Sequence, residues 1–363
     1  MNEAGAAPAA APGAPRPRVA IVGAGPAGLM AAELLAPGHE VILLDRMRGA
    51  GRKLLMAGRG GLNITHSEPM PAFVARYRGS APRLAPILAD FPPAALRAWC
   101  EGLGQPTFVG SSGRVFPQAM KASPLLRAWT RRLEGLGVRI ELGRRWTGWR
   151  EDGALAFVDA QGLDHGVRAD ATILALGGAS WPRLGSDGAW VAPLRAAGVG
   201  VEELAPSNCG VEVAWSAHLR SRFAGAPLKR IALRVGGEGV RGEAVVTARG
   251  LEGGAIYALS APLREAIARD GHARLEVDLR PDMTAGALAQ ALRAPRGAQS
   301  LANFLRKAAG LPPVAVALLR EVHGTALPQA PAALAAAIKA LALRATALSG
   351  LERAISSAGG IAW

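Results

Sequence analysis

The stretch RVAIVGAGPAGLMAAELLAPGHEVILLDR, Arg18 to Arg46, predicts the fold of this chain. Residues 19–22 form a short apolar, β-branched run that predicts a buried strand, and it leads directly into GAGPAG at residues 23–28. In this G-x-G-x-x-G pattern the first glycine permits a tight turn and the second lets a pyrophosphate approach the backbone. The third lets the next helix pack closely on the sheet.

The elements after the glycines complete a dinucleotide-binding unit. The helix expected over residues 27–35 points its N-terminal N–H groups and the positive end of its dipole at the phosphates, and Pro37-Gly38 ends it. A second strand over residues 40–44 delivers Asp45, about twenty residues after the glycines, where a carboxylate accepts hydrogen bonds from an adenosine ribose. An ordinary βαβ unit with a glycine turn is the alternative, but these elements in this order favour dinucleotide binding.

Composition limits the class of protein. The 363 residues, 50% hydrophobic, suffice for a sizeable core and two or three domains. No run approaches the ~18 unbroken apolar residues of a membrane span. Residues 1–17 predict a disordered tail and not a signal peptide, so we expect a cytoplasmic protein without a membrane partner. Cys100 and Cys209 form no C-x-x-C pair and the histidines no H-x-x-x-H pair, so a metal site has no support.

The formal net charge is +14, and most of the excess lies in residues 1–150. A basic field of this size attracts phosphate-bearing partners, whether a dinucleotide or RNA. The alternative is genomic composition, because the basic residues are mostly arginine and the chain is rich in Ala, Gly and Pro, as expected of a GC-rich bacterial genome. RNA therefore stays an alternative partner.

Residues 46–66 carry five positive charges and five glycines and no acidic residue. The segment is too glycine-rich for a helix throughout and too long for a simple turn. It suits a close backbone approach to an anionic or planar ligand, and a solvated flexible loop is the alternative.

The rest of the first half alternates helices and strands. We expect helices within 82–104, one of them starting at Pro92-Pro93, and over 124–136, capped by Ser123. Extended segments are expected at 113–117 and 137–142, in a β-meander at 146–149 and 154–158, and in a buried strand at 171–176. This order predicts an open, mainly parallel α/β sheet.

The second half changes character. Short strands with glycine turns, at 230–235, 243–246 and 273–277, predict an antiparallel barrel or sandwich. From residue 283 to about 340 the sequence is rich in Ala and Leu with helical spacing and is broken by prolines, which predicts a small helical subdomain.

Five segments together resemble the BaiN/RdsA-type (YhiN-like) FAD-dependent oxidoreductases. They are the opening fingerprint, GRKLLMAGRGGLNITHSE (51–68), GRVFPQAMKASPLL (113–126), ALGGASWPRLGSDGAW (175–190) and GEAVVTARGLEGGAIYALS (242–260). Many flavoproteins share the first motif, whereas the second and third are specific to this family.

The resemblance implies a Rossmann-like FAD-binding domain in two parts, with an inserted antiparallel β-barrel and a helical insertion within that barrel. The implied division is a disordered tail over 1–17, the first FAD-binding part over 18–194, the β domain over 195–280, the helical subdomain over 281–340, a return strand over 341–350 and an incomplete second FAD-binding part over 351–363.

The same resemblance implies the cofactor-binding residues. Those at the FAD pyrophosphate and adenosine ribose are Gly23, Gly25, Pro26, Ala27, Gly28, Asp45 and Arg46. Those along the pyrophosphate, ribityl chain and flavin ring are Arg52, Lys53, Gly60 and Asn63. The strand around Trp146 is expected to pass the adenine, and Gly177 and Gly178 to mark a second approach to the flavin.

No catalytic residue follows from the sequence alone, but three are candidates. Lys53 or a helix terminus would stabilise negative charge near flavin N1, while Asn63 and His66 would be polar groups near the substrate. For His66 a plain loop role is the preferred interpretation.

Two departures from the family pattern matter. Many members have Arg-Cys-Asn where this chain has Gly61-Leu62-Asn63, so a thiol near the flavin is absent and the chain belongs to a divergent branch. The family also continues past the element that is Ala358-Gly359-Gly360 here, which predicts a form truncated at the C-terminus.

Three functions follow as hypotheses. The first is a flavin oxidoreductase that reduces a C=C or C=N bond of a small-molecule substrate, with hydride from NAD(P)H or a reduced substrate. The second is an RNA-modifying flavoenzyme that reduces uridine in ribosomal RNA to dihydrouridine. The third is a truncated, non-catalytic remnant that binds FAD poorly. The sequence leaves the substrate and the oligomeric state open.

Overall fold

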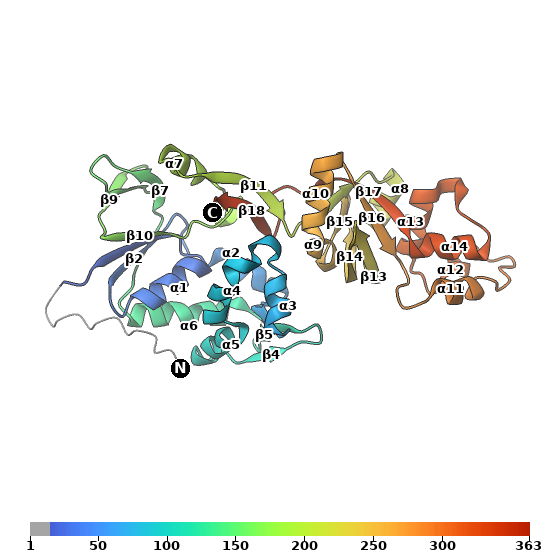
Figure 1. Ribbon diagram of the computed structural model, residues 1–363, viewed down its shortest axis with the longest axis horizontal. Coiled ribbons are helices and arrows are strands. Elements are labelled where there is room, and N and C mark those ends of the chain that lie inside the picture. The colour runs from blue at the N-terminus through green and yellow to red at the C-terminus, as the bar shows by residue number, and fades with distance from the viewer. Residues whose placement is uncertain (1–14) are drawn as a thin grey trace. The chain divides into compact units, whose positions relative to one another are not determined.

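The computed structural model describes residues 15–363 (Figure 1), so most of the predicted tail lies outside the described residues. The chain forms two compact units. Unit 1 contains the described chain up to Gly177 together with Arg183–Val199, and unit 2 contains Gly178–Pro182 and Gly200–Trp363. The finer division into FAD-binding, β and helical parts stays a prediction.

The parallel sheet of unit 1 grows from the fingerprint strand. β1 (Arg18–Val22) pairs with β2 (Glu40–Asp45) on one side and β10 (Ala171–Leu174) on the other, and β6 (Arg139–Leu142) extends the sheet beyond β2. α1 (Pro26–Leu35) connects β1 to β2 as expected. Every pairing in this sheet is parallel, which confirms the predicted α/β architecture.

Helices cover one face of this sheet. Because side chains alternate along a strand, Val19 and Ile21 point to the same face and join the core that α1 and α6 (Ala122–Gly135) form. Glu33 links α1 to α6, because its carboxylate accepts hydrogen bonds from Trp129 Nε1 at 2.7 Å and from Arg132 Nη1 at 2.9 Å.

Two expectations for this unit are wrong in detail. Ser123 does not cap α6. The N-cap is Lys121, whose backbone is extended. The first turn of α6 follows Lys121, packs against Gly58 and contains Ser123. The strand expected at 171–176 is β10, which ends at Leu174 and is not buried. Among the described residues β10 pairs with β1 alone, so this edge strand has neighbours on one side only.

The remaining elements of unit 1 are short. The helical ones are α2 (Arg52–Ala57), η1 (Gly58–Gly60), α3 (Met70–Ala75), η2 (Arg78–Ser80), α4 (Ala81–Asp90), α5 (Pro93–Gly102), η3 (Pro182–Leu184, which spans the boundary between the units) and α7 (Val191–Ala196). The strands are β3 (Thr65–His66), β4 (Thr107–Val109) and β5 (Arg114–Pro117) in one antiparallel sheet, and β7 (Arg145–Trp149), β8 (Leu155–Val158) and β9 (Asp164–Val167) in the predicted meander.

Unit 2 contains a closed antiparallel barrel, which decides between the two architectures expected for this part. The strand order around it is β12 (Val211–Val213), β15 (Gly250–Glu252), β14 (Glu238–Val246), β13 (Pro227–Val235), β16 (Ala273–Asp278) and β17 (Leu341–Leu348). β17 closes the barrel because it pairs with both β12 and β16. Outside the barrel, β11 (Val201–Ser207) pairs with β18 (Ser356–Ile361).

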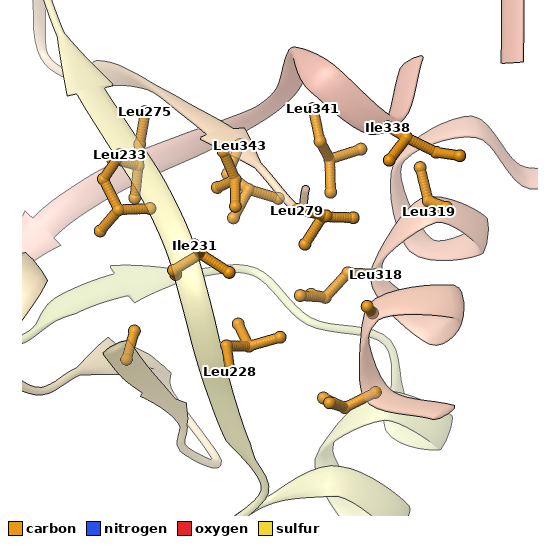
Figure 2. Packing of buried hydrophobic residues seen from close by; sticks show 14 of the residues in the cluster. Leu228, Ile231, Leu233, Leu275, Leu279, Leu318, Leu319, Ile338, Leu341 and Leu343 are labelled. Carbon is orange, nitrogen blue, oxygen red and sulfur yellow. The ribbon is translucent and has the colours of Figure 1, made fainter. Parts of the chain in front are cut away.

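Helices complete the core of unit 2. They are α8 (Ala217–Phe223), α9 (Gly254–Ala258), α10 (Ser260–Asp270), α11 (Ala285–Ala291), α12 (Leu301–Ala309), α13 (Pro313–His323), η4 (Gly324–Ala326) and α14 (Pro331–Lys339). Figure 2 shows how Ile231 and Leu343 of the barrel and Leu318 of α13 belong to one buried cluster. The expected helices after residue 283 are confirmed. None of the helices within residues 15–363 has the length and apolar character to cross a membrane.

Candidate functional site

The glycines of the fingerprint turn differ in their surroundings. A Cβ on Gly23 would lie 2.2 Å from the Ala175 carbonyl oxygen, and one on Gly28 would lie 1.9 Å from the Gly23 oxygen. A Cβ on Gly25 would meet no described atom within 4 Å. Gly25 is the N-cap of α1, followed by Pro26 and Ala27, and no side chain caps that helix end. Packing therefore requires glycine at positions 23 and 28, while Gly25 leaves space for a ligand at the N–H groups of α1.

Asp45 lies beside this turn, at the carboxyl end of β2. Its Oδ2 accepts a hydrogen bond from the Ala24 N–H at 2.7 Å, and its Oδ1 accepts one from the Met47 N–H at 2.7 Å. A carboxylate oxygen has two lone pairs, so each oxygen retains one for a ribose hydroxyl.

The start of β7 lies next to Asp45. The Arg144 N–H donates to the Asp45 carbonyl oxygen at 2.8 Å, and the chain continues into Trp146. Trp146 is only 8% exposed, and its ring stands edge-on to Trp149 with 5.0 Å between ring centroids. Its Nε1 is buried, with no hydrogen-bond partner within residues 15–363.

A second segment covers the turn after β2. A Cβ on Gly185 would lie 2.6 Å from Met47 Cγ, and Arg46 forms an ion pair with Asp187. Burial raises the pKa of Asp187, but the hydrogen bonds from Arg46 and from the Ala189 N–H outweigh it, so the pKa lies below its ordinary value.

The segment over residues 185–190 was not among the predicted site residues. The motif ALGGASWPRLGSDGAW contains it, and that motif was the only signal in the sequence that pointed to it. The same segment ends at Trp190, whose Nε1 is buried and has no partner in the described part of the chain.

The segment over residues 46–66 is not a loop throughout, because it contains α2. Gly51, in the left-handed conformation, is the N-cap of α2, and its N–H donates to the Ala24 carbonyl oxygen at 2.8 Å. α2 thereby starts beside the fingerprint turn. Burial lowers the pKa of Lys53, and Arg52 Nε is buried with no hydrogen-bond partner among the described residues.

The other candidates of this segment are held by the chain itself. Asn63 Nδ2 donates to the carbonyl oxygens of Thr65 at 2.7 Å and Val115 at 3.1 Å. His66 Nδ1 accepts from the Glu68 N–H at 3.1 Å, so the neutral ring donates from Nε2 to the Ser112 oxygen at 3.0 Å. Both ring nitrogens of His66 therefore form hydrogen bonds with the backbone, as expected for a structural role. Gly60 lies in η1, where a Cβ would meet no described atom within 4 Å.

The two glycines after β10 fall in different units. Gly177 belongs to unit 1, and a Cβ on it would lie 3.1 Å from Ser186 Oγ. Gly178 belongs to unit 2, where a Cβ would lie 2.5 Å from Ser357 Oγ. That hydroxyl oxygen accepts hydrogen bonds from the Ala179 N–H at 2.8 Å and from the Ser180 N–H at 3.1 Å.

The groups around Asp45 fit a dinucleotide. Arg52 Nε, Trp146 Nε1 and Trp190 Nε1 are all buried donors, and each lies in a segment bonded to the fingerprint turn or to residues 45–47. A dinucleotide presents phosphate oxygens and ring nitrogens that accept hydrogen bonds. The described residues contain no cluster of His, Cys, Asp and Glu that would hold a metal ion. The fold and this set of groups define a Rossmann-type dinucleotide-binding protein.

Comparison with protein families places the chain within that class. The model for the HI0933-like protein Rossmann domain matches residues 17–363, so the chain belongs to this family of FAD-dependent oxidoreductases. The family resemblance predicted from the motifs is confirmed.

Individual known proteins share lower sequence or structural similarity with this chain. A 3-dehydro-bile acid delta(4,6)-reductase of Clostridium scindens is 27% identical over 282 residues, which cover 76% of this chain and 67% of that protein. The 3-ketosteroid-Δ4-(5α)-dehydrogenase of Rhodococcus jostii RHA1 is 14% identical with a TM-score of 0.43, over 96% of this chain and 85% of that one. Thermovibrio ammonificans THI4 is 16% identical with a TM-score of 0.34, over 58% and 71% of the two chains. The two structural likenesses carry no functional conclusion.

Proposed function

We propose that this chain binds FAD at the fingerprint turn and uses it to reduce a C=C or C=N bond of a small-molecule substrate. NAD(P)H or a reduced substrate would supply the hydride. The open space at Gly25, bordered by the N–H groups of α1 and by Asp45, is the observation that carries the proposal.

The chain's own residues would position the cofactor. The α1 N-terminus would bind the pyrophosphate, with Arg52 Nε as a further donor, and Asp45 would accept from the ribose hydroxyls. Lys53 would place a cation near the flavin, where negative charge develops. When bound, the flavin supplies hydride transfer, which needs little from side chains beyond such positioning. Asn63 and His66 already bond the backbone, so we assign them to holding the loop.

The relative in Clostridium scindens supports the substrate class. That protein is named as a reductase of a 3-dehydro-bile acid, a small molecule. We therefore propose a small cyclic molecule with an electron-poor C=C bond as the substrate of this chain.

Reduction of uridine in RNA is the second candidate. The net charge of +14 favours a polyanionic partner, since each phosphate that a Lys or Arg side chain neutralises releases counterions. This candidate requires selective binding of uridine-containing RNA.

The absorption spectrum of the purified chain tests the proposal first. We expect flavin bands with a cofactor to protein ratio near one, and release of FAD on denaturation. A chain that is colourless and that added FAD does not reconstitute would contradict the proposal. With flavin present, oxidation of NADH and NADPH is then measured with small cyclic enones and, in parallel, with RNA.

A further inference from the structure

One continuous part of unit 2 carries basic side chains and no acidic ones. Residues 213–237 contain five Lys or Arg residues and no Asp or Glu. Four of the five are exposed and belong to α8 and to the start of β13. They are Arg220, Arg222, Lys229 and Arg230, which we call the basic surface.

The link between α8 and β13 holds these side chains on one part of unit 2. Only residues 224–226 separate the two elements. The Gly225 N–H donates to the Val246 carbonyl oxygen at 2.7 Å, and the Val246 N–H donates to the Ala226 oxygen at 3.0 Å. Leu219 of α8 and Leu228 of β13 lie in the same buried cluster. The end of the helix and the start of the strand are therefore fixed side by side.

A β-bulge turns two of the four cations to solvent. Side chains alternate along a regular strand, so two neighbouring core residues are separated by one residue that faces the other way. In β13 the core residues Leu228 and Ile231, both labelled in Figure 2, are separated by two. Only Glu243 of β14 lies opposite Lys229 and Arg230, which defines a bulge, and both cations are exposed.

The backbone of this bulge is strained at Arg230. Its φ is 52°, in the left-handed region that glycine adopts without steric cost and other residues do not. Bulges are found where a strand directs a side chain toward a functional site. An arginine at a position that suits glycine indicates that its guanidinium serves something other than the fold.

The charge of the basic surface is not neutralised. None of its four cations forms an ion pair within residues 15–363, and neither does the exposed Glu243. Other exposed arginines of unit 2 are paired, such as Arg269 with Asp270 and Arg274 with Glu276. The basic surface therefore has a net positive charge that is available to a partner.

The surroundings of these cations distinguish between anionic partners. A membrane surface is bound through inserted apolar side chains, and a protein interface has a buried aromatic or apolar centre. The large hydrophobic side chains of residues 213–237 are all buried or half-buried, so the basic surface offers neither. Binding to a nucleic-acid backbone needs only cations, because each phosphate that they neutralise releases counterions.

We propose that the basic surface of unit 2 binds the phosphodiester backbone of a nucleic acid without reading its bases. RNA and single-stranded DNA present the same phosphates, so the surface binds both. No residue of the fingerprint turn takes part, and the inference does not depend on the proposed function.

Fluorescence anisotropy of the full chain tests this inference, with a 20-nucleotide RNA and DNA of the same sequence at about 25 to 200 mM salt. One double variant combines Lys229→Gln with Arg230→Gln, and another combines Arg220→Gln with Arg222→Gln. We expect each to weaken binding of both nucleic acids at least about tenfold at about 50 mM salt. The slope of log affinity against log salt should fall by about 1.4, at about 0.7 for each lost phosphate contact.

The matched control removes two cations elsewhere in unit 2. Arg269→Gln combined with Arg274→Gln makes the same change in net charge, and these side chains are 72% and 69% exposed but ion-paired. Affinity within about twofold of the parent and an unchanged salt slope are expected.

Arg230→Gly separates loss of binding from loss of folding. Glycine relieves the strained backbone at this position, so the variant should melt no lower than the parent chain. It still removes one cation, and we expect it to bind RNA about three- to tenfold more weakly.

Three results would overturn the inference. Equal losses in the control and in the surface variants would show that binding follows the overall net charge. A parent chain that binds neither RNA nor DNA at about 25 mM salt would refute it directly. Binding to phosphatidylglycerol vesicles that the surface variants lose, with nucleic-acid binding intact, would assign the surface to a membrane.

The flavin content of every variant is measured in parallel. A chain without FAD that binds RNA through the basic surface would contradict the proposed function alone. A chain that holds FAD but binds no nucleic acid would contradict this inference alone.

Discussion

Gly25 and Gly28 look alike in the sequence, but their surroundings give them different tasks. Gly25 has φ −81°, a conformation open to any residue, and its missing side chain faces open space. Gly28 is required by packing, because a Cβ there would lie 1.9 Å from the Gly23 carbonyl oxygen. Gly25 therefore serves ligand binding and Gly28 serves folding, although the two positions are only three residues apart.

Alanine at each of these positions gives a testable contrast. Gly25→Ala should leave the free energy of unfolding within about 1 kcal/mol of the parent and weaken FAD binding at least about tenfold. Gly28→Ala should destabilise the chain by about 3 kcal/mol through overpacking. Urea denaturation and FAD titration of both variants measure this, and a Gly25→Ala chain that binds FAD normally would count against the site.

Helix starts show how local signals and tertiary contacts compete at the scale of the element. Ser300 caps α12, because its Oγ accepts from the Asn303 N–H at 3.2 Å. Ser123 has the residue type and the following proline of a cap, yet it lies within the first turn of α6. The turn starts earlier because Ala122 packs against Gly58, so a tertiary contact decides where α6 begins.

Alanine substitutions again distinguish the two serines. Ser300→Ala should lower stability by about 1 kcal/mol, because it leaves a helix N–H without its acceptor. Ser123→Ala should change stability by less than about 0.5 kcal/mol, since no cap is lost. The urea midpoint followed by circular dichroism reports both, and a Ser123→Ala loss as large as that of Ser300→Ala would refute the assignment of the cap.

At the scale of the whole molecule, the net charge follows from the sequence alone. A net charge of +14 attracts any polyanion, and attraction of this kind carries no sequence information. Charge therefore favours binding of RNA in general but does not by itself make RNA the substrate.

Binding of short RNAs at two salt concentrations tests the role of this charge. We expect a 20-nucleotide RNA to bind at about 50 mM salt, to be released by about 200 mM, and to bind equally with and without uridine. Fluorescence anisotropy measures both affinities. Selective retention of uridine-containing RNA at the higher salt would instead support the second candidate function.

The sequence by itself determined the Rossmann unit, the alternation of helices and strands, and the family, because these depend on local patterns. The periods of apolar residues and the glycine spacing in residues 18–46 specify the Rossmann unit, whereas the resemblance to the family rests on the motifs at 51–68 and 113–126. The strand pattern by itself allowed a barrel or a sandwich, and only the tertiary structure shows the closure, because it depends on β17 pairing with both β12 and β16 across a long separation.

The same reason explains what was missed at the candidate site. Asp187 lies more than 140 residues from Arg46 in sequence, and its motif gave no reason to place it at the end of β2. The ion pair between Arg46 and Asp187 brings that segment to the end of β2, and this contact exists only in the folded chain. Local patterns specify which elements form, whereas long-range contacts decide which side chains meet.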